Sequence, residues 1–200
     1  DFQNDQTNNP LGLRNNTTSQ TVAVDLGLME QLDFVLKQSN IGPTVYTAKY
    51  QILGASRREA KKDNKSLSVT LGYGMGLTDT SSDTDSDLFG NEDFDAEVEQ
   101  TLLEASVIYG YRPHDDTLLY TSFQVTKHDI NISLESSSNA NLNNQDFTLN
   151  TWAYGVSAGA IRYFSTFFMN LEASAQTTDW TNNDPMTYAF INLAVGWKWN

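Results

Sequence analysis

The chain has 200 residues, a formal net charge of −13 and no cysteine. This length suits one domain, and the negative charge disfavours a nucleic-acid partner because phosphates would be repelled. The lack of cysteine excludes disulfides and thiolate metal sites. No run of 18 apolar residues occurs, so we predict no transmembrane helix. No charged-then-apolar leader precedes Asp1, and we expect an exported protein whose signal peptide has been removed.

Residues 1–18 are rich in asparagine and are interrupted by Pro10. Such a segment has too little apolar surface to pack, so we predict a flexible tail. Residues 19–200 show no break in composition, and we treat them as a single domain.

Eight stretches of this domain alternate in polarity with a period of two, which is typical of β-strands. In chain order they cover residues 20–37, 44–56, 66–78, 98–111, 118–129, 147–163, 167–177 and 188–199. A helix over 28–37 is the alternative in the first stretch, but the unbroken parity of Val22, Leu26 and Leu36 favours one long strand. We expect loops over 79–97 and 130–146.

The third stretch shows the pattern most clearly. One face carries large apolar residues such as Leu71, whereas the other carries Gly72, Gly74 and Gly76. Alternating glycines weaken a soluble strand, but inside a narrow barrel they leave room for large side chains from other strands. A transmembrane barrel turns its apolar face to lipid and its polar face inward. We therefore predict an all-β protein, an eight-stranded antiparallel up-and-down transmembrane β-barrel. A soluble, lipocalin-like barrel is the alternative.

Connections and charge indicate an orientation. Short and long connections alternate along most of the chain, as in outer-membrane barrels with short periplasmic turns and longer outside loops. Nine acidic residues and no basic one lie from Asp79 to Glu99, at the end with long loops. Most basic residues lie at the end with short turns. We expect the acidic loops outside the cell and the amino terminus in the periplasm.

The chain resembles the small eight-stranded outer-membrane barrels of Gram-negative bacteria, the group typified by OmpX, the OmpA membrane domain and OmpW. The most specific part is the last stretch, FINLAVGWKW from Phe190 to Trp199, which is similar to the signal read by the barrel-insertion machinery; Asn200 departs from it. The resemblance implies a porin-like monomer in the outer membrane, in contact with lipid and lipopolysaccharide. It also implies, as an alternative, a narrow channel or conduit for small solutes or apolar molecules.

Eight strands leave an interior that side chains fill. We predict a polar network in this lumen, formed by Asp25, Lys49, Gln51, Glu104, Tyr120, Gln124, Glu172, Gln176 and Lys198. Glu104 and Gln124 should lie nearly opposite each other, and Asp25 and Lys198 should approach each other where the barrel closes. Aromatic residues near strand ends predict an interfacial girdle, formed by Tyr46, Tyr73, Tyr109, Tyr111, Trp152, Tyr154, Trp197 and Trp199.

Two patterns suggest chemistry at the outer end. Asp83, Asp85 and Asp87 alternate as carboxylates suited to loosely bound Ca²⁺ or Mg²⁺, although a solvated loop explains them as well. His128, Asp129 and Ser133 are candidates for a lipid hydrolase at the rim. No catalytic motif supports this, so we expect no enzyme and no tightly bound cofactor. The favoured role is structural or surface interaction through the acidic loops.

Overall fold

The computed structural model describes residues 21–39, 42–55, 59–84, 92–136, 145–180 and 185–197. These residues form nine strands and no helix, and hence no helix able to cross a membrane. The strands are β1 (Thr21–Gly27), β2 (Leu32–Ser39), β3 (Thr44–Leu53), β4 (Lys65–Thr84), β5 (Glu92–His114), β6 (Thr117–Ser136), β7 (Gln145–Tyr163), β8 (Phe167–Trp180) and β9 (Met186–Trp197).

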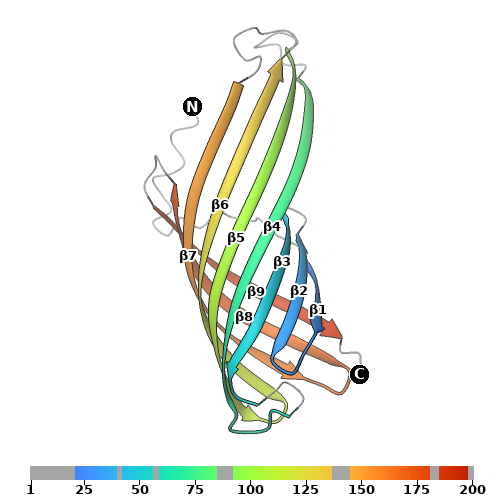
Figure 1. Cartoon of the computed structure of the whole chain (residues 1–200), viewed down its shortest axis with the longest axis vertical. Helices are drawn as coiled ribbons and strands as arrows, with labels where there is room; N and C mark the ends of the chain where they lie inside the picture. The colour runs from blue at the N-terminus through green and yellow to red at the C-terminus, as the bar shows by residue number, and fades with distance from the viewer. Residues whose placement is uncertain are drawn as a thin grey trace.

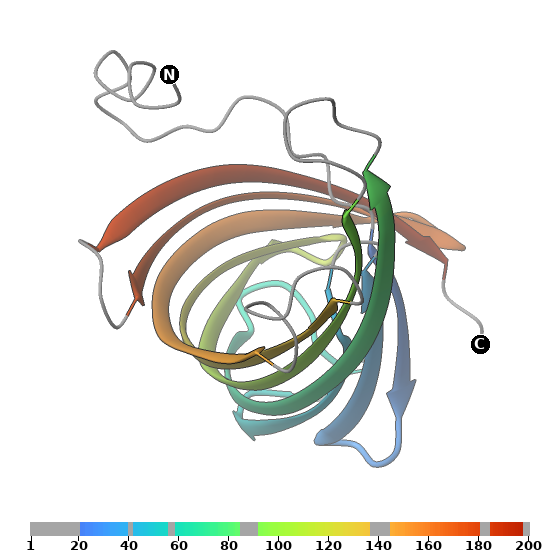
Figure 2. The same cartoon turned by 90° about the horizontal axis from the view of Figure 1, so that it is seen from above.

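The strands form one antiparallel sheet in which each strand pairs with the next along the chain. Seen from above, the sheet curls around a central space (Figure 2). The strands β4 to β7 are the longest and rise beyond the others at one end (Figure 1). The edge strands β1 and β9 are not hydrogen-bonded to each other. The prediction of an all-β, antiparallel, up-and-down sheet is confirmed.

The first predicted strand is in fact two strands. The chain reverses at residues 28–31, where the backbone amides of Leu28 and Met29 donate to the carbonyl of Leu32 over 2.9 and 3.1 Å. Residues that pair across this hairpin are both even-numbered or both odd-numbered, as in Leu26 opposite Phe34. The apolar positions therefore keep one parity through the turn, and a period-two pattern cannot detect the reversal. The count is nine strands rather than eight.

Two segments expected to be loops are largely strand. The β4–β5 ladder continues to the pair Thr84 and Glu92, and the β6–β7 ladder continues to Leu134 and Gln145. The remaining connections, residues 85–91 and 137–144, lie outside the described residues. The loop prediction was wrong because residues 79–84 are uniformly polar and because the apolar positions of β5 and β6 have already changed parity where these segments begin.

The outer face of the sheet is apolar and exposed. Leu71, Val107 and Leu193 are 69, 46 and 70% exposed, and other exposed large apolar side chains lie on every strand except β2. Between these positions, Gly72, Gly74, Ser68 and Ser157 are buried on the other face. Among the described residues, only Val45, Leu102 and Ala153 are buried hydrophobic residues. A soluble barrel would have the opposite arrangement.

Candidate functional site: the polar inner face

The inner face is the concave side of the curled sheet, and side chains from non-adjacent strands meet there. Lys37 on β2 reaches Glu104 on β5, and Tyr120 on β6 reaches Glu172 on β8. Each contact passes over at least one intervening strand, which only the concave side of a curved sheet allows. This face is therefore the part of the molecule where a functional site would be enclosed.

The carboxylate of Glu104 is the centre of one cluster. The ammonium group of Lys37 and the hydroxyl of Thr47 both donate to Glu104 Oε1, over 3.0 and 2.7 Å. The Glu104 side chain lies across Gly72, where an added Cβ would meet it at 2.6 Å from Oε1. Its side chain is 22% exposed. The glycine thus provides the space that lets a carboxylate reach a lysine three strands away.

A second cluster surrounds the hydroxyl of Tyr120. This hydroxyl donates to Glu172 Oε2 over 2.6 Å and lies 3.1 Å from Asn170 Oδ1. Asn192 donates its amide to Glu172 Oε1 over 3.0 Å. The ring of Tyr120 covers Gly159, where a Cβ would lie 2.6 Å from the ring. Both carboxylate oxygens of Glu172 thus have a donor, as a charge away from bulk water requires.

Hydroxyl pairs and a buried cation add further polar groups to the inner face. Thr70 and Ser106 lie 2.7 Å apart, and Ser122 and Ser157 lie 2.8 Å apart. At the end with the short turns, Arg112 is buried, and its guanidinium lies 5.0 Å from the centre of the Tyr163 ring. Such a contact stabilises a cation shielded from water. The arrangement offers internal polar contacts rather than a bare cavity.

The predicted lumen residues are only partly brought together. Glu104 and Tyr120 are in separate clusters, and Lys49 forms an ion pair with Asp33 at 3.7 Å. Glu104 pairs with Thr126 and Gln124 with Ser106, so Glu104 and Gln124 are diagonal neighbours one rung apart. Gln124 packs over Gly155, which pairs with Gln176, whereas the amide of Gln51 donates to the carbonyl of Ala55. Lys198 lies outside the described residues, so its approach to Asp25 stays a prediction.

Sequence reasoning missed Lys37 and Asp33. Both alternate with Phe34 and Leu36, whose large apolar side chains belong to the outer face. The alternation that identified Asp25 therefore also marks these two as inner-face residues, once it is extended to the end of β2. Their ion pairs connect β2 to β5 and to β3.

On β5, β6 and β7 the two faces exchange their polarity at one level, whereas Met75 and Leu77 of β4 keep exposed apolar side chains on the outer face above that level. On the outer face, Leu103, Lys127 and Trp152 form one rung of directly paired residues, and Thr101, Asp129 and Asn150 form the next. Below this switch rung of Leu103, Lys127 and Trp152, the outer face is apolar. Above it, the outer positions include Glu97, Glu99, Asn131 and Thr148, while the inner positions include Val98, Ile130, Ile132, Phe147 and Leu149.

The switch rung is common to β5, β6 and β7. Three strands with unrelated sequences change polarity at the same hydrogen-bonded level, which chance does not favour. On these three strands, outer side chains below the rung suit an apolar solvent, and those above it suit water. Lys127 and Asp129, at this boundary, form an ion pair at 2.7 Å.

The predicted girdle residues lie on the outer face. Tyr46 and Tyr73 pair directly and share the level of Trp152, with Tyr154 one rung below. Tyr109 and Trp197 lie toward the opposite end, and Tyr111 donates its hydroxyl to Asp63 beyond the strand. Trp199 lies outside the described residues. Tyr50 and Phe123 are exposed on the outer face between these two levels, so the girdle stays a prediction.

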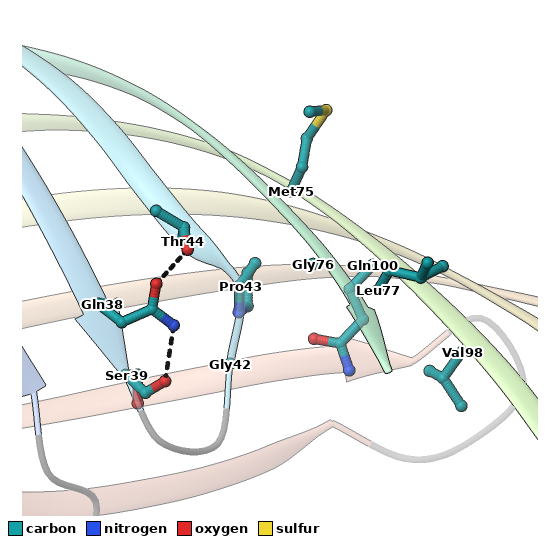
Figure 3. Close-up of a pocket in the computed structure, with 10 residues that line it drawn as sticks. All are labelled: Gln38, Ser39, Gly42, Pro43, Thr44, Met75, Gly76, Leu77, Val98 and Gln100. Carbon is teal, nitrogen blue, oxygen red and sulfur yellow. Dashed lines mark hydrogen bonds between the residues drawn. The ribbon is translucent and has the colours of Figure 1, made fainter. Parts of the chain in front are cut away.

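A pocket opens where the β2–β3 hairpin ends beside β4, which is the longer strand and continues past it (Figure 3). Its volume is about 630 Å³. The side chain of Gln38 contacts both Thr44 and the carbonyl of Ser39 there (Figure 3). The lining residues are uncharged, and they are Gln38, Ser39, Gly42, Pro43, Thr44, Met75, Gly76, Leu77, Val98 and Gln100. This pocket provides no general acid or base.

The predicted hydrolase residues are not brought together. His128 is on the inner face of β6, whereas Asp129 and Ser133 are on its outer face. Asp129 pairs with Lys127, and the hydroxyl of Ser133 donates to Asp146 over 2.9 Å. A nucleophile and its base must lie within hydrogen-bond reach, so these three residues do not form a catalytic group.

The predicted cation site lies mostly outside the described residues, because these exclude Asp85 and Asp87 and the side chain of Asp83. Within the part of the chain that the structure describes, no three His, Cys, Asp or Glu residues are grouped to hold a metal ion.

Comparison with known proteins identifies no relative: no family model, no curated protein and no solved structure matches this chain.

Proposed function

We propose that this protein is an integral β-barrel of a bacterial outer membrane with a non-enzymatic, surface-interaction role. The observation that carries the proposal is the exposure of large apolar side chains on the outer face while glycine, hydroxyl and charged residues share the inner face. Exposing that apolar surface to water would cost roughly 25 cal/mol for each Å². A lipid environment therefore explains the exposed apolar side chains best.

The strands above the switch rung support the surface role. Their outer positions include Glu97, Glu99, Asp146 and Asn131, which suit water. The formal charge of this end is strongly negative, and the proposal places it outside the cell, facing other molecules. The contact with lipid and lipopolysaccharide and the monomeric state, both expected from the sequence, belong to this proposal.

Fractionation of cells that express the full chain tests the location. The proposal expects the protein in the outer-membrane fraction, retained after carbonate extraction and released by detergent. Recovery as a soluble periplasmic protein without detergent would refute the membrane proposal and restore the lipocalin-like alternative.

Conductance across a planar bilayer separates the structural role from a narrow channel. The Glu104 and Glu172 clusters place side chains across the inner face. Because these side chains would fill the lumen, we expect no steady channel openings. Reproducible single-channel steps would instead support the channel alternative.

A further inference from the structure

The two edge strands of the sheet, β1 and β9, would be unfavourable inside a membrane. The outer side of β1 and the outer side of β9 have no strand partner among the described residues. In hydrocarbon, each unpaired backbone group costs several kcal/mol, so open sheet edges do not occur there. If the proposed membrane location holds, both edges must be covered.

We propose that β1 and β9 of the same chain pair with each other in a parallel arrangement, which closes a nine-stranded barrel. An up-and-down sheet with an odd number of strands has its first and last strands running in the same direction. Both views show the carboxyl end of β9 on the side of the molecule where β1 lies (Figures 1 and 2). The nearest candidate partner for each edge is therefore the other edge.

Barrel geometry specifies the register of this seam. Nine strands about 4.8 Å apart, rising about 3.3 Å per residue and tilted by 35–45°, need a stagger of roughly 9 to 13 residues. The stagger must be even, because an odd one would turn outer side chains inward. The rung that starts at Leu26 ends at Thr187. A stagger of about ten residues places Leu26 beside Trp197.

The same register places Val24 beside Val195 and Val22 beside Leu193. All of these side chains are on the outer face and exposed, so the seam would present a continuous apolar surface to lipid. The stagger can only run toward the carboxyl end of β9, because Thr187 lies next to the first residue of this strand. A larger stagger would move Leu26 beyond Trp197, the last residue of β9.

This closure reverses one expectation from the sequence. With eight strands, both ends of the barrel sequence lie in the periplasm. With a parallel seam, β1 runs in the same direction as β9, so Thr21 begins β1 on the side away from the end where Trp197 finishes β9. Thr21, the first residue of β1, would then lie at the outer side.

Cysteine cross-linking tests the seam, because the chain has no native cysteine. The pair Val24→Cys and Val195→Cys, placed in the full chain and oxidised in outer membranes, should form an intramolecular disulfide in most molecules, since directly paired strands bring Cα atoms within bridging distance. The pair Ala175→Cys and Ala189→Cys is the folding control, because these residues pair directly between β8 and β9.

Three results would overturn the parallel seam. A disulfide between Leu36→Cys and Val195→Cys instead would show closure of eight strands by β2, with β1 displaced. A disulfide between two chains would show that a second copy covers the edges. A control pair that cross-links while the seam pair does not would show that the edges stay apart. Fractionation of the same cells reports the membrane location independently.

Discussion

The interaction between Glu104 and Lys37 connects β5 to β2 across the inner face. The Glu104 side chain crosses β4 at Gly72, which has no side chain, and Thr47 of β3 donates to the same carboxylate oxygen. The Lys37 side chain is 39% exposed, which weakens the pair by screening. Its main importance is that each group satisfies the other in a partly enclosed space.

We predict that Glu104→Ala lowers the free energy of unfolding by about 1–3 kcal/mol, because it leaves Lys37 and Thr47 without their acceptor. Equilibrium unfolding in urea with the protein in detergent micelles or lipid measures this change. The double variant with Lys37→Met should recover part of the loss, since the unpaired cation is removed. An unchanged midpoint for Glu104→Ala would show that the cluster contributes nothing.

Gly159 should tolerate no side chain. A Cβ there would lie 2.6 Å from the Tyr120 ring and 2.8 Å from the backbone carbonyl of Leu171, and the backbone cannot move aside cheaply. We predict that Gly159→Ala lowers stability by about 1–3 kcal/mol. Gly27→Ala is the control, because its nearest neighbour is the Asp33 carboxylate at 3.6 Å, and it should change stability by less than about 0.5 kcal/mol. Equal losses would contradict the packing described.

At the scale of strands, the alternation of polarity predicts most elements but not their ends. The glycines of β4 and the outward leucines identify the faces from sequence alone, because the period of a strand is fixed at two residues. The hairpin at 28–31 was missed because a same-parity turn leaves the pattern intact. The upper parts of β5 and β6 were missed because the faces exchange there, which resembles a loss of pattern.

The same limit applies to the inner face. The sequence places Glu104, Tyr120 and Glu172 on one face, because each alternates with apolar neighbours. It does not predict that Glu104 meets Lys37 while Tyr120 meets Glu172. Those choices depend on the curvature of the sheet and on which glycines leave space, and both arise only when the strands are assembled.

The switch rung predicts different responses to a charge on either side of it. Val107 lies two rungs below this level on the outer face of β5, and Thr101 lies one rung above it. Val107→Lys should lower stability by about 2–4 kcal/mol, whereas Thr101→Lys should change it by about 0–1 kcal/mol, because a charge is disfavoured only within hydrocarbon. Unfolding of both variants in lipid vesicles tests this. Similar losses for the two would show that no membrane boundary lies between them.

The whole molecule is a curled sheet with apolar side chains outside and polar ones inside, and on β5, β6 and β7 this polarity reverses above the switch rung. In the proposed membrane location, the lower part of the sheet would face lipid outside and hold polar contacts inside, and the upper part of β5, β6 and β7 would face water. The proposed role in the outer membrane depends on this division, and so does the closure of β1 against β9. No charge cluster or pocket among the described residues replaces it as an explanation.

Spin-label accessibility tests this division most directly. Labels at Leu71→Cys, Val107→Cys and Leu193→Cys report the outer face, and a label at Ser106→Cys reports the inner face in the same reconstituted protein. We predict that oxygen dissolved in lipid reaches the three outer labels and that a water-soluble nickel complex does not, with Ser106→Cys shielded from lipid oxygen. Outer labels that the nickel complex reaches freely, or that protein buries from both reagents, would contradict the account.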